Sequence, residues 1–281
     1  MAGVSTKEIK NRIRSMESTK QITKAMEMVA ASKLRRAQAQ VSNSRPYFEL
    51  LSNSISSIVR ANRDFSSPYL KPRTGNKVLY IVIAGDRGLA GGYNSNVLKM
   101  VMADIKDKDA IVLPIGKKSV EFFRARKLPA LSEAYAEVAE LSVGDCFSIS
   151  KMLSTAYLNG EFDEVRIAYT KFQSAISQVP TSQQLLPLVL PENEERAPYT
   201  SDFIYDPNTE EVFAAVVPEY LGGIVYGAIC ESRASEQGAR RTAMDSATSN
   251  AEEMIADLSL KFNRARQAAI TNEIIDIVAG S

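Results

Sequence analysis

The sequence opens and closes with long stretches that contain neither glycine nor proline. Residues 4–45 and 239–279 form such stretches of 42 and 41 residues, and residues 47–67 add 21 more. Because an average helix has only about 11–12 residues, stretches of this length indicate a coiled coil or a helical repeat. Ser5 followed by Glu8 forms a capping-box pattern, which predicts a helix start. A helix from there to Ala61 would be about 85 Å long, which exceeds the width of a compact domain of this size.

Apolar residues in both end segments recur at the spacing of a coiled-coil seam. Near the C-terminus the steps are three or four residues long, through Met244, Ala247, Ala251, Ile255, Leu258, Phe262, Ala265 and Ala269. The N-terminal segment carries a stripe of Met26, Val29, Leu34, Ala37, Val41, Phe48, Leu51, Ile55 and Ile58. Each stripe needs a partner, and because the chain leaves and returns, we predict that the two helices pair antiparallel. Two unrelated helices that pack on one core are the alternative.

The middle of the chain alternates short apolar runs with helical patterns. We expect strands at 77–84, 110–115 and 164–170, and helices at 95–108, 119–126 and 143–158. Six of the eleven prolines lie in residues 180–219, which indicates loops and an edge strand there. The predicted fold class is therefore α/β with long helices, in which a small Rossmann-like parallel-sheet domain is inserted into an antiparallel coiled coil. The expected boundaries are 1–62 and 208–281 for the coiled coil, 76–190 for the α/β domain, and 63–75 and 191–207 for connecting loops and a foot.

Composition excludes several classes of function. The chain has 45% apolar and 24% charged residues, which is typical of an ordinary globular protein. It contains no histidine, which excludes Ser-His-Asp and Cys-His catalysis and histidine-ligated zinc. Cys146 and Cys230 lie far apart in the sequence, which suits neither a zinc site nor a disulfide framework. No apolar stretch approaches the 18 or so residues of a transmembrane helix, so we expect no direct membrane insertion.

The glycine-rich segment Gly85–Gly92 follows the first predicted strand, where a dinucleotide fold places its phosphate-binding turn. Its spacing is GxxGxxGG rather than GxGxxG, and the second strand ends in Ile115-Gly116 without the expected acidic residue. Gly116-Lys-Lys-Ser119 is similar to the end of a phosphate loop, but Ile111 stands where the first glycine belongs. We therefore interpret these glycines as structural, and we expect no nucleotide, cofactor or metal.

Charge is distributed unevenly although 34 basic residues nearly balance 33 acidic ones. Residues 1–40 hold nine Lys and Arg against three Glu, whereas 133–164 and 192–219 are strongly acidic. No aromatic residue precedes Tyr47, so the basic helix lacks the features of a nucleic-acid or membrane-surface element. The pattern indicates a charged rod in contact with an acidic protein surface. The last twelve residues are rich in isoleucine, and we expect other chains to enclose this apolar end.

Five segments carry a resemblance that covers essentially the whole chain in order. They are Thr19–Lys33, Gly85–Gly92, Ser177–Thr181, Ala234–Gln237 and Asn263–Thr271, and they resemble the gamma subunit of F-type ATP synthase. The resemblance implies a non-catalytic rotor subunit whose coiled coil turns inside a ring of three alpha and three beta subunits. It also implies contact with an epsilon subunit and with the membrane c-ring. In that family the rotor couples ion translocation to ATP synthesis or hydrolysis.

The resemblance also suggests which residues contact partners. Arg266 and Gln267 match the family's Arg-Gln pair, which contacts an acidic loop of beta, and a bidentate Arg–carboxylate contact suits such a latch. Further beta-facing positions are Lys24, Met26, Thr271 and Glu273. Phe203, Tyr205 and Asp206 align with the foot that touches epsilon and the c-ring.

Two departures from family members bear on the source of the chain. Ala90 stands where several relatives have Cys, and the Cys-containing insertion of chloroplast gamma is missing between about residues 190 and 212. We therefore expect a bacterial-type subunit, peripheral on the cytoplasmic face of the plasma membrane, without thiol regulation. A nucleotide-binding α/β enzyme with helical arms and a basic coiled coil that binds nucleic acid are the competing hypotheses.

Overall fold

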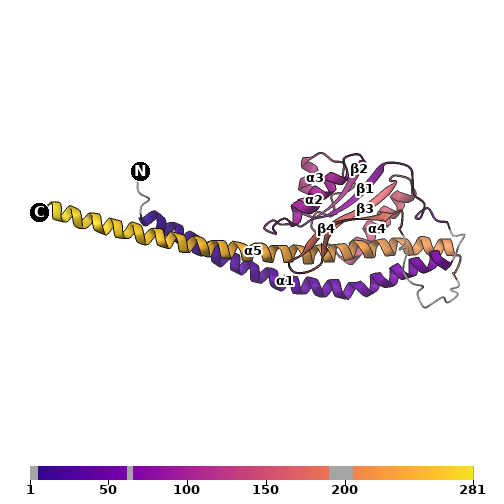
Figure 1. Cartoon of the computed structure of the whole chain (residues 1–281). Coiled ribbons are helices and arrows are strands. Elements are labelled where there is room, and N and C mark those ends of the chain that lie inside the picture. The colour runs from indigo at the N-terminus through magenta and orange to yellow at the C-terminus, as the bar shows by residue number, and fades with distance from the viewer. Residues whose placement is uncertain (1–5, 62–65, 190–204, 281) are drawn as a thin grey trace. The chain divides into compact units, whose positions relative to one another are not determined.

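The computed structural model describes residues 6–61, 66–189 and 205–280, and it divides into two compact units. The terminal unit consists of residues 1–32 and 240–281, and the central unit of residues 33–239. Helices α1 (Thr6–Ala61) and α5 (Thr209–Ala279) each contribute to both units (Figure 1). The helix predicted to end at Ala61 is confirmed. The prediction of loop and edge strand up to residue 219 was too long, because α5 already begins at Thr209.

The central unit contains a four-stranded sheet in the order β2-β1-β3-β4. Strands β1 (Lys77–Ile83), β2 (Asp109–Ile115) and β3 (Glu164–Phe172) run parallel, as predicted. The fourth strand, β4 (Gln178–Leu186), pairs antiparallel with β3 at the edge, so the sheet is mixed rather than wholly parallel. A short hairpin connects β3 to β4, and such a connection permits only antiparallel pairing.

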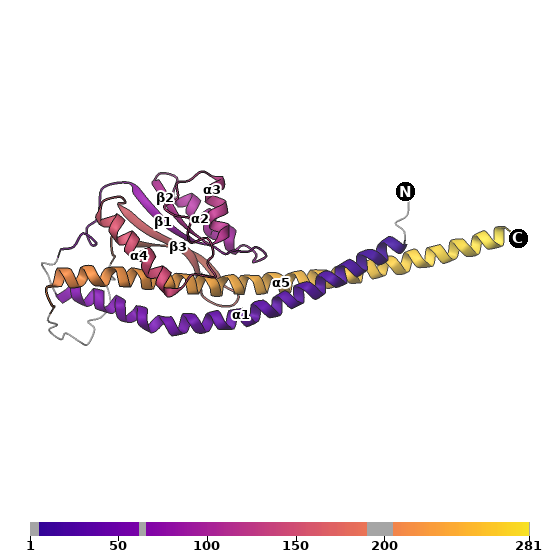
Figure 2. The same cartoon turned by 180° about the vertical axis from the view of Figure 1, so that it is seen from behind.

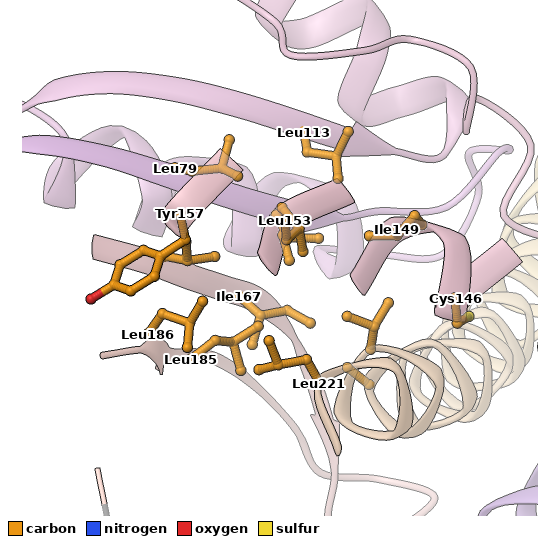
Figure 3. Close-up of a cluster of buried hydrophobic side chains, with 14 of the residues drawn as sticks. Leu79, Leu113, Cys146, Ile149, Leu153, Tyr157, Ile167, Leu185, Leu186 and Leu221 are labelled. Atoms are coloured by element: carbon orange, nitrogen blue, oxygen red, sulfur yellow. The ribbon is translucent and has the colours of Figure 1, made fainter. Parts of the chain in front are cut away.

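Helices cover both faces of this sheet (Figures 1 and 2). Helices α2 (Tyr93–Asp104) and α3 (Lys117–Ala125) pack on one face, where Tyr80 and Val82 meet Val97 and Phe123. Helices α4 (Val143–Leu158) and α5 pack on the other face. Figure 3 shows this second core, in which the labelled side chains of α4 gather with residues from all four strands and with Leu221 of α5. Strands buried on both faces explain the continuous apolar runs of the sequence.

Within the central unit the large Phe48 side chain of α1 packs against α5. The Phe48 ring lies against Gly223 and Gly227, where an added methyl group would approach ring atoms to 2.9 and 3.0 Å. It also makes an edge contact with Tyr226, with ring centroids 6.3 Å apart. Glycine in a helix interior costs about 1 kcal/mol relative to alanine, so these glycines are explained by the close approach of the Phe48 ring.

The terminal unit consists of the two helices paired antiparallel along a narrow seam. Thr23 and Thr248 share a buried hydrogen bond of 2.8 Å, and Lys20 Nζ lies 2.8 Å from Glu252 Oε1. Lys20 precedes Thr23 on α1, whereas its partner Glu252 follows Thr248 on α5, so the two helices run in opposite directions. This confirms the predicted antiparallel pair and excludes two unrelated helices packed on a common core.

Apart from some residues such as Ala31 and Ser56, the buried and half-buried residues of α1 follow a heptad pattern. From Thr6 to Ile58 they recur in alternating steps of three and four residues, which is the spacing of a coiled-coil seam. Phe48, Leu51, Ile55 and Ile58 were predicted correctly as part of it. Val29 was assigned wrongly, because its side chain is 55% exposed and Ala30 occupies the buried position instead. A small residue at this position allows the two helices to approach closely.

On α5 the predicted seam holds as far as Ala265. Met244 and Ala251 are buried, and the seam residues from Ile255 to Ala265 are half-buried. Ala269 is exposed, so the predicted stripe extends beyond the contact with α1. Helix α1 begins only at Thr6, and the last turns of α5 therefore have no helical partner within the described chain.

Helix α5 also meets a simple criterion for a membrane span. It contains an 18-residue window with a mean hydropathy of 1.6, of which 44% is buried within the protein. A helix in a protein core meets the same criterion. Because Phe213, Val217 and Leu221 are buried in the core beside the sheet, we attribute the hydropathy of α5 to core packing.

Candidate functional site

Lys24 and Met26, two of the predicted contact residues, lie on α1 in the terminal unit. The Lys24 side chain is 54% exposed, and its Nζ donates a 2.8 Å hydrogen bond to Glu27 Oε2. This hydrogen bond raises the pKa of Lys24, which keeps the ammonium group charged. Met26 is half-buried beside the seam. Because they are two positions apart, the two side chains lie on different sides of the helix.

Arg266, Gln267, Thr271 and Glu273, the other predicted contact residues, lie on α5 beyond the seam. All four side chains are exposed, and Thr271 Oγ1 donates to the Gln267 carbonyl at 2.9 Å, within the helix. Lys20 pairs with Glu252, so Arg266 lies about 20 Å further along α5 than this contact. The structure therefore places the two groups of predicted contact residues at different levels of the terminal unit.

The C-terminal turns of α5 are apolar and exposed. Every side chain that the structure describes from Arg266 to Gly280 is exposed. The exposed fraction is 72% for Ile277 and 70% for Val278, and Ile270, Ile274 and Ile275 are also exposed. Clustered exposed apolar residues on a helix end are typical of a surface that binds a partner.

A second apolar surface was missed by sequence reasoning. Ile22, Met28 and Val29 are 58%, 60% and 55% exposed on α1, close in sequence to Lys24. They lie off the heptad seam, and this departure is the signal that could have identified them. Val29 was instead assigned to the seam. Ile22 and Val29, seven residues apart, share a face of the helix, which we call the α1 surface, whereas Lys24 and Met28 lie on other sides of the helix.

The predicted foot residues are only partly placed by the structure. Phe203 lies outside the described residues. Tyr205 packs, half-buried, against the core on the α4 and α5 face of the sheet, whereas Asp206 is exposed. Of this group, Asp206 is thus the described residue that is presented to solvent.

The glycine-rich segment Gly85–Gly92 has a structural role. Asp86 accepts backbone N–H bonds from Lys117 and Val138 through Oδ1, at 3.2 and 3.0 Å, and from Ala139 through Oδ2 at 3.1 Å. Gly116, with φ of +92°, lies so close to the Ala84 carbonyl that an added methyl group would be 2.0 Å from its oxygen. The hydrogen bonds of Asp86 and the close contact of Gly116 thus join the segment after β1 to the start of α3 and to residues 138–139. This agrees with the structural interpretation of the motif.

A side chain of α5 lies at the place where an α/β fold of this kind binds nucleotides. Ligands bind such folds where the connections from adjacent strands diverge, here beyond the carboxyl ends of β1 and β3. At this place α5 supplies Glu236, whose side chain is 8% exposed. A methyl group added to Gly85 would lie 3.0 Å from the Glu236 carboxyl carbon. A carboxylate thus stands against the glycine-rich segment, where a phosphate would stand in a nucleotide-binding protein.

Comparison with known proteins agrees with a fold that combines two long paired helices with an α/β sheet. A family model described as ATP synthase matches residues 5–281. The ATP synthase gamma chains of Ruminococcus albus and Moorella thermoacetica are 45% and 43% identical to this chain, over 98% of its length and 97% of theirs. The gamma chain of Brevibacillus brevis is 45% identical, with the same coverage. The chain belongs to the ATP synthase gamma chain family.

Solved structures show the same fold in more distant proteins. A chain from the rotor of the Euglena gracilis mitochondrial ATP synthase has a TM-score of 0.67 at 15% identity, with 94% of this chain and 98% of that chain covered. A chain from the central stalk and c-ring of the Tetrahymena thermophila enzyme has a TM-score of 0.60 at 24% identity, with 80% and 99% covered. As a gamma-family chain, the protein is a subunit associated with an ATP synthase complex at a membrane.

Proposed function

We propose that this gamma-family chain is the central-stalk rotor subunit of an F-type ATP synthase. It transmits torque between the membrane c-ring and the catalytic alpha/beta hexamer, and so couples ion translocation to ATP synthesis or hydrolysis. One observation carries the proposal: the long helices α1 and α5, of 56 and 71 residues, pair antiparallel in the terminal unit of a chain of this family. Paired helices are stiffer than single ones, and stiffness is what torque transmission requires.

Coupling by such a subunit rests on differential binding. Three beta subunits in different states each meet a different side of one asymmetric helix pair, and each orientation stabilises a different set of states. The terminal unit has the required asymmetry, because α1 presents the apolar α1 surface and the Lys24 side chain on different sides, whereas the C-terminal turns of α5 are apolar beyond Arg266.

The chain itself performs no bond chemistry in this proposal. The crevice that would bind a nucleotide holds the Glu236 side chain, and a carboxylate there repels phosphate as well as excluding it by volume. The catalytic activity accordingly belongs to the assembled complex.

The proposed beta contacts are Lys24 and Met26 on α1, and Arg266, Gln267, Thr271 and Glu273 on α5. To these we add Ile22 and Val29 of the α1 surface, and Met28, because exposed apolar side chains on a helix that also carries exposed lysine suit partners that are both apolar and acidic. Arg266 is exposed and lies on a helix, so its guanidinium can form a directional contact with a carboxylate that torque can break.

The remaining partners are three alpha subunits, an epsilon subunit and the c-ring, without nucleic acid. Residues 1–62 and 208–281 form the rotating helix pair, residues 76–190 form the α/β domain, and Tyr205 and Asp206 belong to the foot beside the connecting loops. The bacterial sources of the similar gamma chains support a location on the cytoplasmic face of the plasma membrane, as a peripheral protein.

Purification of the complex tests the proposal. A tag on this chain is expected to recover alpha and beta subunits at one copy of the chain per hexamer. Recovery without alpha and beta would contradict the rotor role. ATP turnover by the purified chain alone would instead favour the α/β enzyme, and salt-sensitive affinity for duplex DNA would favour the nucleic-acid binder.

An arginine substitution tests the proposed latch. Arg266→Ala is expected to lower ATPase activity or assembly of the reconstituted complex while the α/β domain stays folded. Arg264→Ala, which removes an exposed arginine two residues earlier, is the matched control. Equal activity and assembly in both variants and the wild type would show that the proposed contact between Arg266 and a beta-subunit carboxylate contributes little.

A further inference from the structure

Strand β3 continues beyond the point where its neighbour β1 ends. The parallel pairing of β1 with β3 stops at Val82 and Ala168, whereas β3 itself continues to Phe172. On the other side, Thr170 lies opposite Pro180 of β4 in a pair whose backbone N–H and C=O groups point away from each other, so β4 supplies no partner either. The buried backbone of Thr170, with 1% of the residue exposed, therefore needs partners from outside the sheet.

Helix α5 provides these partners. Ser232 Oγ accepts a hydrogen bond from the Thr170 N–H at 3.3 Å, and Ser235 Oγ donates to the Thr170 carbonyl at 2.9 Å. Glu231 Oε2 accepts from the N–H of Phe172 at 3.3 Å. Ser232 and Ser235 are 1% and 0% exposed, so water does not compete for these bonds. Side chains of α5 thus supply the hydrogen bonds that a neighbouring strand would otherwise provide to the end of β3.

These contacts hold α5 differently from its apolar contacts. Burial of apolar surface is non-directional, and it would allow the helix to turn or slide by small amounts. Hydrogen bonds to the backbone N–H and C=O of one residue restrict both the rotation of the helix about its axis and its position along that axis. Further along, Gly238 lies against the β3–β4 connection, where an added methyl group would be 3.3 Å from the Ala175 carbonyl oxygen. Segment 231–238 of α5 is therefore held against the sheet by directional contacts.

We propose that Ser232 and Ser235 are positioning residues through which torque passes between the sheet and α5. The proposal rests on the rotor function proposed above. Torque applied to the α/β domain turns α5 without slippage, because rotation of the helix alone would leave the N–H and C=O groups of Thr170 buried without partners.

The experiment uses the complete ATP synthase reconstituted in liposomes, with ATP hydrolysis and ATP-driven ion uptake measured on the same vesicles. The variant Ser232→Ala/Ser235→Ala is expected to hydrolyse ATP while the number of ions moved per ATP falls at least about twofold. Peptides that contain Thr170 are expected to exchange amide hydrogen at least about tenfold faster than in the wild type. Ser246→Ala/Ser249→Ala removes two exposed hydroxyls from the same helix and is expected to match the wild type in both measurements.

Faster exchange at Thr170 with an unchanged number of ions per ATP would overturn the proposal, because the bonds would be lost without effect on coupling. Unchanged exchange would overturn it as well, because the serines would not be the partners of Thr170. If the double variant fails to assemble, the two single variants carry the same comparison. Failure of the wild-type chain to couple hydrolysis to ion uptake would contradict the rotor function instead, so the two proposals are tested separately.

Discussion

The hydroxyl oxygens of Thr23 and Thr248 lie 2.8 Å apart in the seam between α1 and α5, where the two residues are 9% and 7% exposed. Each hydroxyl also lies within hydrogen-bond distance of a carbonyl in its own helix, Thr23 of Lys20 at 3.1 Å and Thr248 of Met244 at 2.9 Å. One threonine thus donates across the seam while the other donates to its own backbone. A buried polar pair of this kind specifies the register of paired helices.

Replacement of the two threonines by valine is expected to reveal this bond as a coupling free energy. In either single variant the remaining hydroxyl still donates to its own helix, so the single cost is small and reflects the lost interhelical bond. Urea unfolding of Thr23→Val, Thr248→Val and the double variant is expected to give a coupling free energy of about 1 kcal/mol. Costs that simply add would show that the hydroxyls do not interact.

Ala251→Leu is expected to destabilise the helix pair. Ala251 is 3% exposed in the seam, and the added side chain would force the helices apart at a cost of roughly 1–3 kcal/mol. Ala256→Leu, on the exposed face of the same helix, is expected to change the free energy of unfolding by less than about 0.5 kcal/mol. Thermal unfolding of the two variants makes the comparison. Equal melting temperatures for Ala251→Leu and the wild type would place residue 251 outside the interface.

Two glycine-to-alanine substitutions are expected to have opposite effects on stability. Gly116→Ala would place a methyl group 2.0 Å from the Ala84 carbonyl oxygen at a positive φ, and we expect a loss of at least about 3 kcal/mol. Gly144→Ala, in the first turn of α4, meets only ordinary contacts, and we expect a gain of about 0.4–1 kcal/mol. Chemical denaturation of both variants tests the pair. A stable Gly116→Ala variant would contradict the described junction.

The capping box of α4 is expected to make stability depend on pH. Ser142 donates to the Asp145 carboxylate from Oγ at 2.6 Å and from its backbone N–H at 2.8 Å, and these bonds lower the pKa of Asp145 below its ordinary value of 3.8. A carboxylate whose pKa is lowered by folding stabilises the folded state above the unfolded pKa. This contribution is lost as the pH falls through the folded pKa.

The variant Asp145→Asn tests this dependence. The difference in free energy of unfolding between wild type and variant is expected to be constant near neutral pH and to shrink below about pH 4. Asp109→Asn, at the exposed start of β2, measures the effect of removing another surface carboxylate. A difference that stays the same down to pH 2 would show that the capping bonds do not depend on ionisation.

Much of the architecture followed from local patterns. The bounds of α4 were predicted to the residue, and strands β1, β2 and β3 lie within a residue or two of the predicted runs. The antiparallel sense of β4 could not be predicted in this way, because apolar periodicity reports burial but not strand direction. The α1 surface escaped prediction because Val29 and Ala30 are adjacent apolar residues, and only the position of the partner helix distinguishes them.

The candidate contact residues came from resemblance rather than from physical pattern. Arg266 and Gln267 are exposed polar residues on a helix, and nothing in their spacing marks them among the other charged positions of α5. Periodicity identifies the side of a helix that packs, because burial is strong and repeated. A surface that binds a partner has no comparable period. Its residues are recognised only in the structure, where apolar side chains such as Ile277 and Val278 are exposed to solvent.

The lengths of the helices, the order of the elements and the heptad seam are encoded locally, in the spacing of apolar residues and the absence of breakers. Pro46 and Pro218 nevertheless lie inside helices, and Gly222 makes room in α5 for the Phe147 ring. In the sequence, Ser232 and Ser235 are ordinary polar positions of a helix. Their role follows from the sheet, because β3 extends beyond β1 and the Thr170 backbone needs partners from α5. Such roles arise from contacts between segments distant in sequence, where burial overrides local preference and every enclosed polar group must find a partner.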